Sequence, residues 1–273
     1  MLICCVGTAL AQGVHYSRVP RDVIESRLRQ YGGDNAQREA TLKQLLVQAG
    51  CDEKHLSEQA VKDLKQPNVI CTLPGNSNRT IIVGAHFDRV PRGDGVVDNW
   101  SGASLLPSLL QSLLGQPRTH TYVFIGFAGE ESGEIGSHFY VQHMTPDEVA
   151  ATDAMVNLDT LGLSPTKVWG SHSDKLLIGA LGYMAKQLND PVSIEDVEQV
   201  GSTDSEQFAV RKIPRITVHS LTQKTWDARI LHTANDKISQ INLDDYYQTY
   251  GLLAAYVAFL DQLPDRTAPA QKP

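Results

Sequence analysis

The sequence lacks any apolar segment long enough to cross a bilayer, which takes about 20 consecutive residues in a helix. It also lacks an excess of positive charge, since 24 Lys and Arg stand against 31 Asp and Glu, and the formal net charge is -7. Proteins that bind nucleic acid use clustered Lys and Arg to replace the counterions of the phosphates. We therefore expect neither stable membrane insertion nor a nucleic-acid partner.

Cysteine is scarce too, with four in a chain of 273 residues, and two of them lie close to the start. Residues 1–11 are mostly small and apolar, and Ala9, Leu10 and Ala11 match the small-residue cleavage site of a secretory signal. The segment therefore predicts a signal-peptide remnant and a secreted or periplasmic protein. A frayed or packed N-terminus is the alternative, because no charged residue precedes the apolar run.

The other two cysteines, Cys51 and Cys71, form an even pair in a chain that is expected to be exported. Oxidising compartments favour disulfides, so a bond between them is one expectation. Two buried free thiols are the other, because pairing does not follow from sequence alone.

Short apolar runs alternate with amphipathic segments over residues 14–263, which we interpret as one domain followed by a flexible tail at 264–273. The first long helix is expected to begin with a capping box formed by Asp34 and Gln37. The expected strands are 68–73, 80–85, 121–128, 154–158, 167–170 and 216–220; the pattern over 16–50 is helical, and further helices are expected at 99–114, 174–188 and 243–263. This alternation predicts a three-layer α/β fold, with helices flanking a mixed, mostly parallel central sheet.

Imidazole and carboxylate side chains come directly after three of the expected strands. They are His86 and Asp88, Glu130 and Glu131, and Asp159. Ligands bind outside the carboxyl ends of parallel strands, so we expect these side chains to share one crevice. Singly, each would be an ordinary cap or surface residue. Together they suit zinc, and their mutual repulsion favours a bound cation.

Five segments around these residues occur in a specific order and spacing. They are GAHFD at 84–88, VDNWSGA at 97–103, AGEES at 128–132 followed by Gly136 and Ser137, NLDTL at 157–161, and LHTAND at 231–236. In this order they resemble peptidase family M28, the co-catalytic zinc peptidases, over residues 68–263. The resemblance implies a zinc-exopeptidase fold, two Zn2+ ions per chain, peptide substrates and aminopeptidase activity.

The resemblance also implies a metal ligand at five positions. Asp98 would bridge the two ions, His86 and Asp159 would complete one site, and Glu131 and His232 would complete the other.

Further residues take roles around those ligands by the same resemblance. Asp88 would hold the His86 imidazole from behind, and Asp236 would do similar work behind His232. Glu130 would be the general base that takes a proton from water and passes it to the leaving amine; a further ligand or a structural residue is the alternative. Ser205 stands where the family commonly has a His, which puts that residue's substrate contact in doubt.

Three other functions remain open at this point. A glutaminyl cyclase shares the fold and similar ligands, but the run 98–102 and the short 131–136 connection are closer to the peptidases. A carboxypeptidase or dipeptidase uses a related metal centre. A non-catalytic, receptor-like binding protein would be expected to lose ligands, which this sequence keeps. Trp100, Tyr183 and Trp226 are interpreted as core residues rather than as the lining of a substrate pocket.

Overall fold

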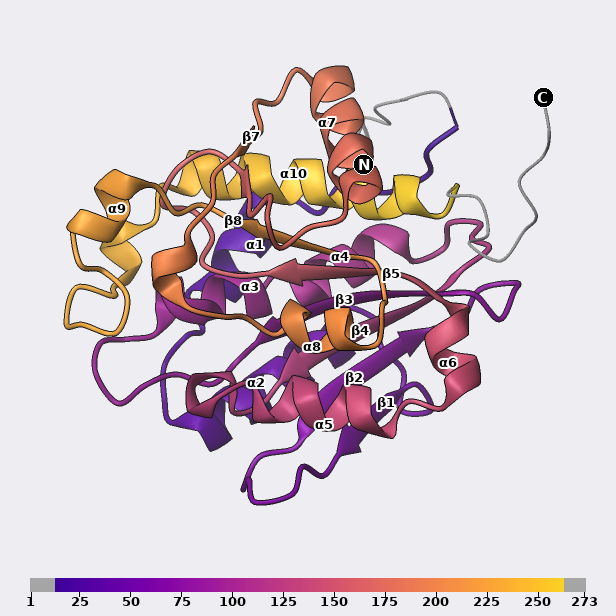
Figure 1. Ribbon diagram of the computed structural model, residues 1–273, viewed down its shortest axis with the longest axis horizontal. Coiled ribbons are helices and arrows are strands. Elements are labelled where there is room, and N and C mark those ends of the chain that lie inside the picture. The colour runs from indigo at the N-terminus through magenta and orange to yellow at the C-terminus, as the bar shows by residue number, and fades with distance from the viewer. Residues whose placement is uncertain (1–12, 263–273) are drawn as a thin grey trace, which may run out of the picture.

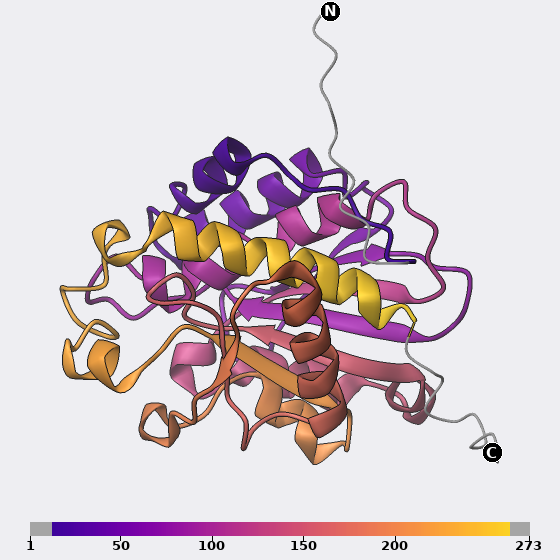
Figure 2. The same ribbon diagram turned by 90° about the horizontal axis from the view of Figure 1, so that it is seen from above.

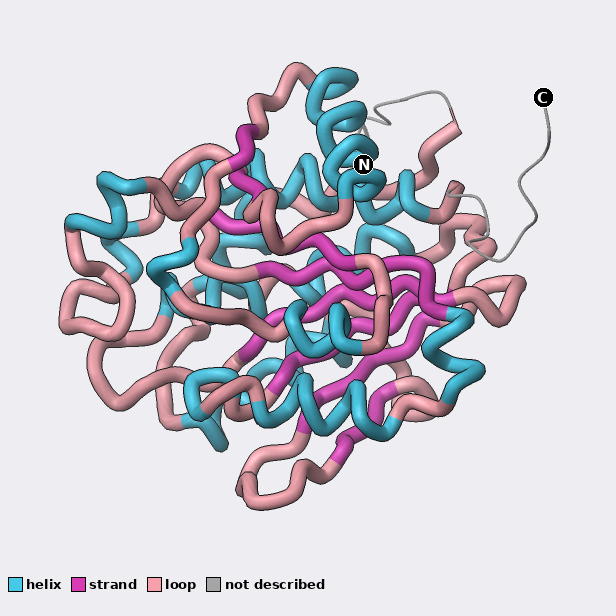
Figure 3. The backbone as a smooth tube through the Cα atoms, in the orientation of Figure 1, coloured by secondary structure: helices cyan, strands magenta, loops and turns pink. Residues whose placement is uncertain are grey.

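The computed structural model describes residues 13–262. The predicted signal remnant at 1–11 and the predicted tail at 264–273 therefore lie outside the described residues. A twisted sheet crosses the middle of the molecule, with helices packed around it (Figures 1 and 3). No helix within 13–262 combines the length and the apolar character needed to span a membrane.

The sheet has eight strands in the order β1-β2-β4-β3-β5-β8-β6-β7. Their bounds are Leu56–Gln59 (β1), Asn68–Leu73 (β2), Thr80–His86 (β3), Thr121–Phe127 (β4), Thr152–Leu158 (β5), Lys167–Val168 (β6), Ser193–Ile194 (β7) and Arg215–His219 (β8). The four central strands β4, β3, β5 and β8 run parallel, whereas β1 and β2 pair antiparallel, as do β2 and β4, and β6 and β8. The predicted mixed, mostly parallel sheet is confirmed.

Helices cover both faces of this sheet. They are α1 (Arg21–Leu28), α2 (Asn35–Gln48), α3 (Ser101–Ala103), α4 (Leu106–Leu113), α5 (Ile135–His143), α6 (Pro146–Ala151), α7 (Lys175–Leu188), α8 (Ser205–Val210), α9 (Gln223–Asp227) and α10 (Leu243–Leu260). Figure 2 shows α10 and the N-terminal helices on one side of the sheet and α8 on the other.

Alternate residues of β3 enter different hydrophobic cores. Ile81 and Val83 belong to the larger core, which includes α2, α4, α7 and α10. Ile82 faces the smaller core, where it joins Val141 of α5 and Phe208 of α8. A strand buried on both faces has an apolar residue at nearly every position, which is why its sequence shows a continuous apolar run.

Helix α2 is fixed at both ends. Asp34 and Gln37 form the predicted capping box, each side chain accepting from the other's backbone N–H at 2.9 Å. Beyond the C-terminal end, Cys51 forms a disulfide with Cys71 of β2, so the first of the two expectations for these cysteines is confirmed.

Two of the sequence expectations differ from the structure. The single helix expected over 99–114 begins later, because Asn99 still has non-helical backbone angles within the turn η1 (Val96–Trp100), and it is interrupted at Ser104 and Leu105, between α3 and α4. The short strand β7 has no counterpart among the expected strands, and neither does β1. Its sequence, LSEQ, is polar because it forms an exposed or half-buried edge of the sheet.

Candidate metal centre

Imidazole and carboxylate side chains meet at the carboxyl edge of the sheet. His86 is the last residue of β3, Asp159 follows β5, and Glu131 lies in the turn η2 (Glu130–Ser132) that follows β4. Two groups have ligand atoms that all lie within 4.8 Å of one another: His86, Asp98 and Asp159, and Asp98, Glu131 and His232. The structure thus brings together all five residues to which the resemblance gave a ligand role.

Asp98 belongs to both groups, and its two oxygens face different histidines. Oδ1 lies 3.4 Å from Nε2 of His86, and Oδ2 lies 3.1 Å from Nε2 of His232. The remaining spacings are similar: 2.9 Å from His232 to Glu131 and 3.8 Å from His86 to Asp159. Two donors that bind one tetrahedral zinc at about 2.0–2.1 Å lie about 3.3 Å apart, so these spacings fit zinc.

The backbone around Asp98 is held by a carboxylate from a distant loop. Asp236 accepts hydrogen bonds from the N–H groups of Val96, Val97 and Asp98 at 2.9, 2.8 and 3.1 Å. Both of its oxygens are used in this way, so Asp236 supports Asp98. No hydrogen bond joins Asp236 to His232 within residues 13–262, so the expectation that Asp236 also works behind His232 stays a prediction.

Asn99 and Ser101 connect the η1 turn to the end of β5. The Asn99 amide donates to Leu158 O at 2.8 Å, and its oxygen accepts from the N–H of Thr160 at 3.1 Å. The Ser101 hydroxyl donates to Val97 O and accepts from the N–H of Leu161. These bonds fix Asp98 relative to Asp159.

Asp88 lies behind the His86 imidazole, with Oδ1 at 3.6 Å from Nδ1. This distance exceeds that of a hydrogen bond, and Nδ1 has no hydrogen-bond partner among the described residues. The carboxylate instead accepts from the backbone N–H of Glu130 at 3.1 Å and of Glu131 at 3.3 Å. Asp88 therefore positions the turn that carries both glutamates.

Glu130 points to the same space but belongs to neither ligand group. Its Oε2 is 3.8 Å from Nε2 of His86. Burial is the main cause that raises the pKa of Glu130 well above its usual value, and the nearby carboxylates of Asp204 and Asp159 raise it further against the opposing effect of His86. Glu130 is thus a largely buried carboxylate, 14% exposed, whose surroundings favour its protonated form.

Negative charge exceeds positive charge around the two histidines. Burial disfavours charge on His86, yet Glu130 and the other carboxylates outweigh it and raise its pKa well above the usual value. Hydrogen bonds to Asp98 and Glu131 raise the pKa of His232 to about 10. A divalent cation would relieve the same excess of negative charge. The donors, imidazole nitrogen and carboxylate oxygen, are those that zinc binds.

Thr203 is a site residue that the sequence did not single out by itself. Its hydroxyl donates to Oδ2 of Asp159 at 2.7 Å and accepts from the Asn157 amide at 2.7 Å. It lies two residues before Ser205, whose position in the family is a substrate contact, and that resemblance was the available signal. The neighbouring Ser205 is buried and pairs with Thr217 at 2.8 Å, so its hydroxyl faces the core.

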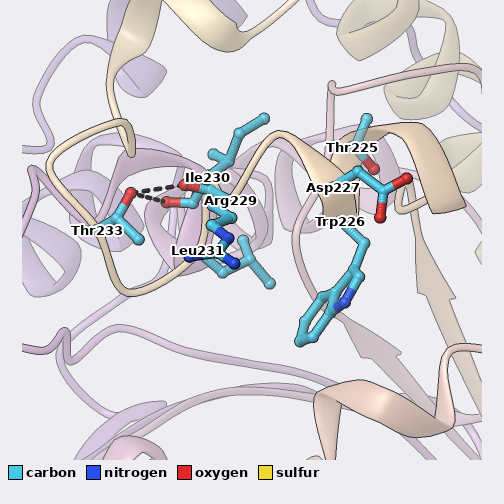
Figure 4. Close-up of a pocket in the computed structure, with 7 residues that line it drawn as sticks. All are labelled: Thr225, Trp226, Asp227, Arg229, Ile230, Leu231 and Thr233. Atoms are coloured by element: carbon cyan, nitrogen blue, oxygen red, sulfur yellow. Dashed lines mark hydrogen bonds between the residues drawn. The ribbon is translucent and has the colours of Figure 1, made fainter.

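Residues that neighbour His232 in the sequence line a pocket of about 460 Å³. Residues of α9 and of the following loop line it, including Trp226 and Leu231, as Figure 4 shows. Trp226 is 36% exposed and Tyr183 is 51% exposed, so the expectation that they are core residues is wrong. Trp100 is fully buried, as expected.

Comparison with known proteins agrees with this geometry. Residues 68–257 match the model of peptidase family M28, and the chain belongs to this family. Aminopeptidase YwaD of Bacillus subtilis (strain 168) is 31% identical over 128 residues, which are 47% of this chain and 26% of that relative. The chain thus matches only a part of that protein's length.

Solved structures show the same fold. BSAP, a zinc aminopeptidase from Bacillus subtilis, has a TM-score of 0.64 at 27% identity, over 70% of this chain and 49% of that chain. An Acidobacteriales bacterium glutaminyl cyclase has a TM-score of 0.73 at 18% identity, over 94% of this chain and 99% of that chain. At that identity the likeness to the cyclase shows the fold alone.

Proposed function

We propose that this chain is a zinc-dependent aminopeptidase that releases single residues from the free N-terminus of peptides. The observation that carries the proposal is Asp98, whose two oxygens face His86 and His232 separately. A carboxylate so placed could serve two zinc ions, one that His86 and Asp159 would help to hold and another that Glu131 and His232 would help to hold.

The protein's own residues supply the proton transfer. Zinc, when bound, acts as a Lewis acid that polarises a peptide carbonyl and eases the loss of a proton from water. Glu130 accepts that proton while the water oxygen attacks the carbonyl carbon, and it delivers the proton to the leaving nitrogen as the C–N bond breaks. Burial raises the pKa of Glu130, which favours its uptake of a proton. Asp88 holds it in place through the backbone N–H.

Three peptides test the proposal: one with a free N-terminus, its N-acetylated twin, and one that begins with glutamine. Each is incubated with the zinc-loaded protein and with protein treated with a chelator, and the products are identified by mass spectrometry. We expect single residues to be released from the free peptide only, and only with zinc. Equal cleavage of the acetylated twin would contradict an aminopeptidase.

Cyclisation of N-terminal glutamine is a second candidate, because a glutaminyl cyclase has the same fold over nearly the full length of both chains. The run 98–102 and the short 131–136 connection favour the peptidase instead. In the same experiment, formation of pyroglutamate without hydrolysis would establish the cyclase.

Export is part of the proposal. It is supported by the small, apolar residues 1–11 and by the Cys51–Cys71 disulfide, because disulfides persist mainly in oxidising compartments. Fractionation of producing cells should recover the mature protein outside the cytoplasm, and recovery from the cytoplasm alone would contradict export.

A further inference from the structure

The loop of residues 87–95 joins β3 to the η1 turn and contacts both glutamates of the site. Within it, Asp88 accepts hydrogen bonds from the N–H groups of Glu130 and Glu131. The N–H of Val90 donates to Oε1 of Glu131 at 3.3 Å. The position of the 87–95 loop therefore determines where the base and one metal ligand lie.

Arg38 of α2 holds both ends of this loop. Its Nε donates to Phe87 O at 2.6 Å, at the start of the loop, and its Nη2 donates to Gly95 O at 2.8 Å, at the end. A third, longer bond of 3.3 Å runs from Nη1 to Asp94 O. The rigid guanidinium thus fixes the separation between Phe87, which follows His86, and Gly95, which precedes the η1 turn that carries Asp98.

The Arg38 side chain is fully buried, although arginine is almost never so unless it is paired. Its guanidinium lies 5.2 Å from the centre of the Trp100 ring, in the same turn as Asp98. Burial, and then the nearby charge of Arg89, lower the pKa of Arg38 to about 10, so it stays cationic at neutral pH. The carboxylates of Asp88, Asp236 and Asp98 attract this charge.

We propose that Arg38 is a positioning residue for the zinc site: it sets the geometry of Asp88, Glu130 and Glu131 by clamping the 87–95 loop to α2. The inference rests on the proposed function, since it concerns the same metal centre. Arg38 lies upstream of residues 68–257, the part of the chain that matches the family model. Helix α2 is a firm support, because the disulfide ties its C-terminal end to β2.

The test compares matched substitutions of two buried arginines. Arg38→Lys keeps the charge and most of the aliphatic stem but loses the fork that spans the loop, and Arg38→Met removes the charge as well. Arg27 of α1 is the control: it is 6% exposed and bonds Ser108 and Gln111, away from the metal ligands. Zinc affinity is measured by competition with a chromophoric chelator, and kcat, KM and thermal stability are measured for each variant.

For Arg38→Lys we expect zinc affinity to fall roughly 10–100-fold, as when an outer partner of a metal ligand is lost, with kcat lowered and KM nearly unchanged. Arg38→Met should lose at least as much. Arg27→Lys and Arg27→Met should lower thermal stability while zinc affinity and kcat stay at wild-type values. Wild-type zinc affinity and kcat in folded Arg38→Lys would overturn the inference, as would equal zinc losses in the Arg27 variants. A wild-type protein that binds no zinc would instead contradict the proposed function.

Discussion

Two buried histidines lie at opposite ends of the same parallel strands, and both are surrounded by carboxylates. At the amino end, His120 precedes β4, with Nε2 at 3.0 Å from Asp153 and Nδ1 at 3.1 Å from Asp261. Arg79 adds a second cation, which bonds Asp153 through Nε at 2.8 Å. At the carboxyl end, Nε2 of His86 faces several carboxylates at 3.4–3.8 Å.

The difference lies in how completely each cluster satisfies its own groups. Around His120, two cationic side chains meet two carboxylates, and both ring nitrogens have partners, so the cluster is complete without a ligand. Around His86 the carboxylates outnumber the cations, and Nδ1 has no hydrogen-bond partner among the described residues. A histidine among acids therefore indicates a metal site where the negative charge is left unbalanced.

The largest expected effect is on kcat, and it distinguishes the carboxyl-end cluster from the amino-end cluster. Glu130→Gln should lower kcat about 10²–10⁴-fold, the range for a lost general base, because the amide cannot accept the proton. Its zinc content should stay at the wild-type level. His120→Gln, at the other end, should leave kcat and zinc content unchanged in the folded protein. Steady-state kinetics with metal analysis checks both, and near-wild-type turnover in Glu130→Gln would refute the role assigned to it.

Zinc removal should affect the carboxyl end only. We expect about two zinc equivalents per chain, the number that a bridging carboxylate serves, and free zinc at about 100 times its Kd should add about 2.7 kcal/mol per occupied site to the free energy of unfolding. Glu131→Gln should weaken binding at one site and so reduce the tightly held zinc toward one equivalent. Denaturant melts with and without chelator measure the change. No loss of stability on chelation would contradict a metal centre here.

The contrast also explains which parts of the site the sequence could predict. Apolar runs that end in His86, Glu130 and Asp159 predict strands, and parallel strands bring their carboxyl ends together, so this part of the site followed from pattern and topology. His232 lies on a loop without periodicity, and only the resemblance to the family indicated it.

The contacts of Arg38 and Asp236 could not be predicted from the sequence, and the reason is physical. A charged residue on an amphipathic helix is exposed by default, and nothing local shows that Arg38 is buried against the carbonyl groups of Phe87 and Gly95, which are far along the chain. Asp236 is close to His232 in the sequence but bonds the backbone of Val96 and Val97, because the loop folds back over the η1 turn. Such partners are set by tertiary structure.

The smallest expected effect concerns the stability that the His120 cluster at the amino end contributes, and it depends on pH. Burial alone would lower the pKa of His120, but hydrogen bonds to Asp153 and Asp261 outweigh it and raise the pKa to about 9. An unfolded histidine titrates near ~6.5. The folded state therefore binds the proton more tightly, and the resulting stabilisation is fully present below the unfolded value and is lost as the pH rises through about 9.

The difference in unfolding free energy between wild type and His120→Gln reports on His120 and on the two carboxylates that it bonds, because the contributions of titrating groups outside this cluster cancel. We expect a difference on the order of 2 kcal/mol near pH 6, which shrinks as the pH rises toward the folded pKa of about 9. At the acid end the same bonds lower the pKa of Asp153 and of Asp261, so the cluster also weakens when these carboxylates are protonated. Denaturant melts of the two proteins across this range provide the measurement. If the difference stays constant up to pH about 10, the proton on His120 does not stabilise the fold. The amino-end cluster could then no longer be interpreted as cations and carboxylates that balance one another.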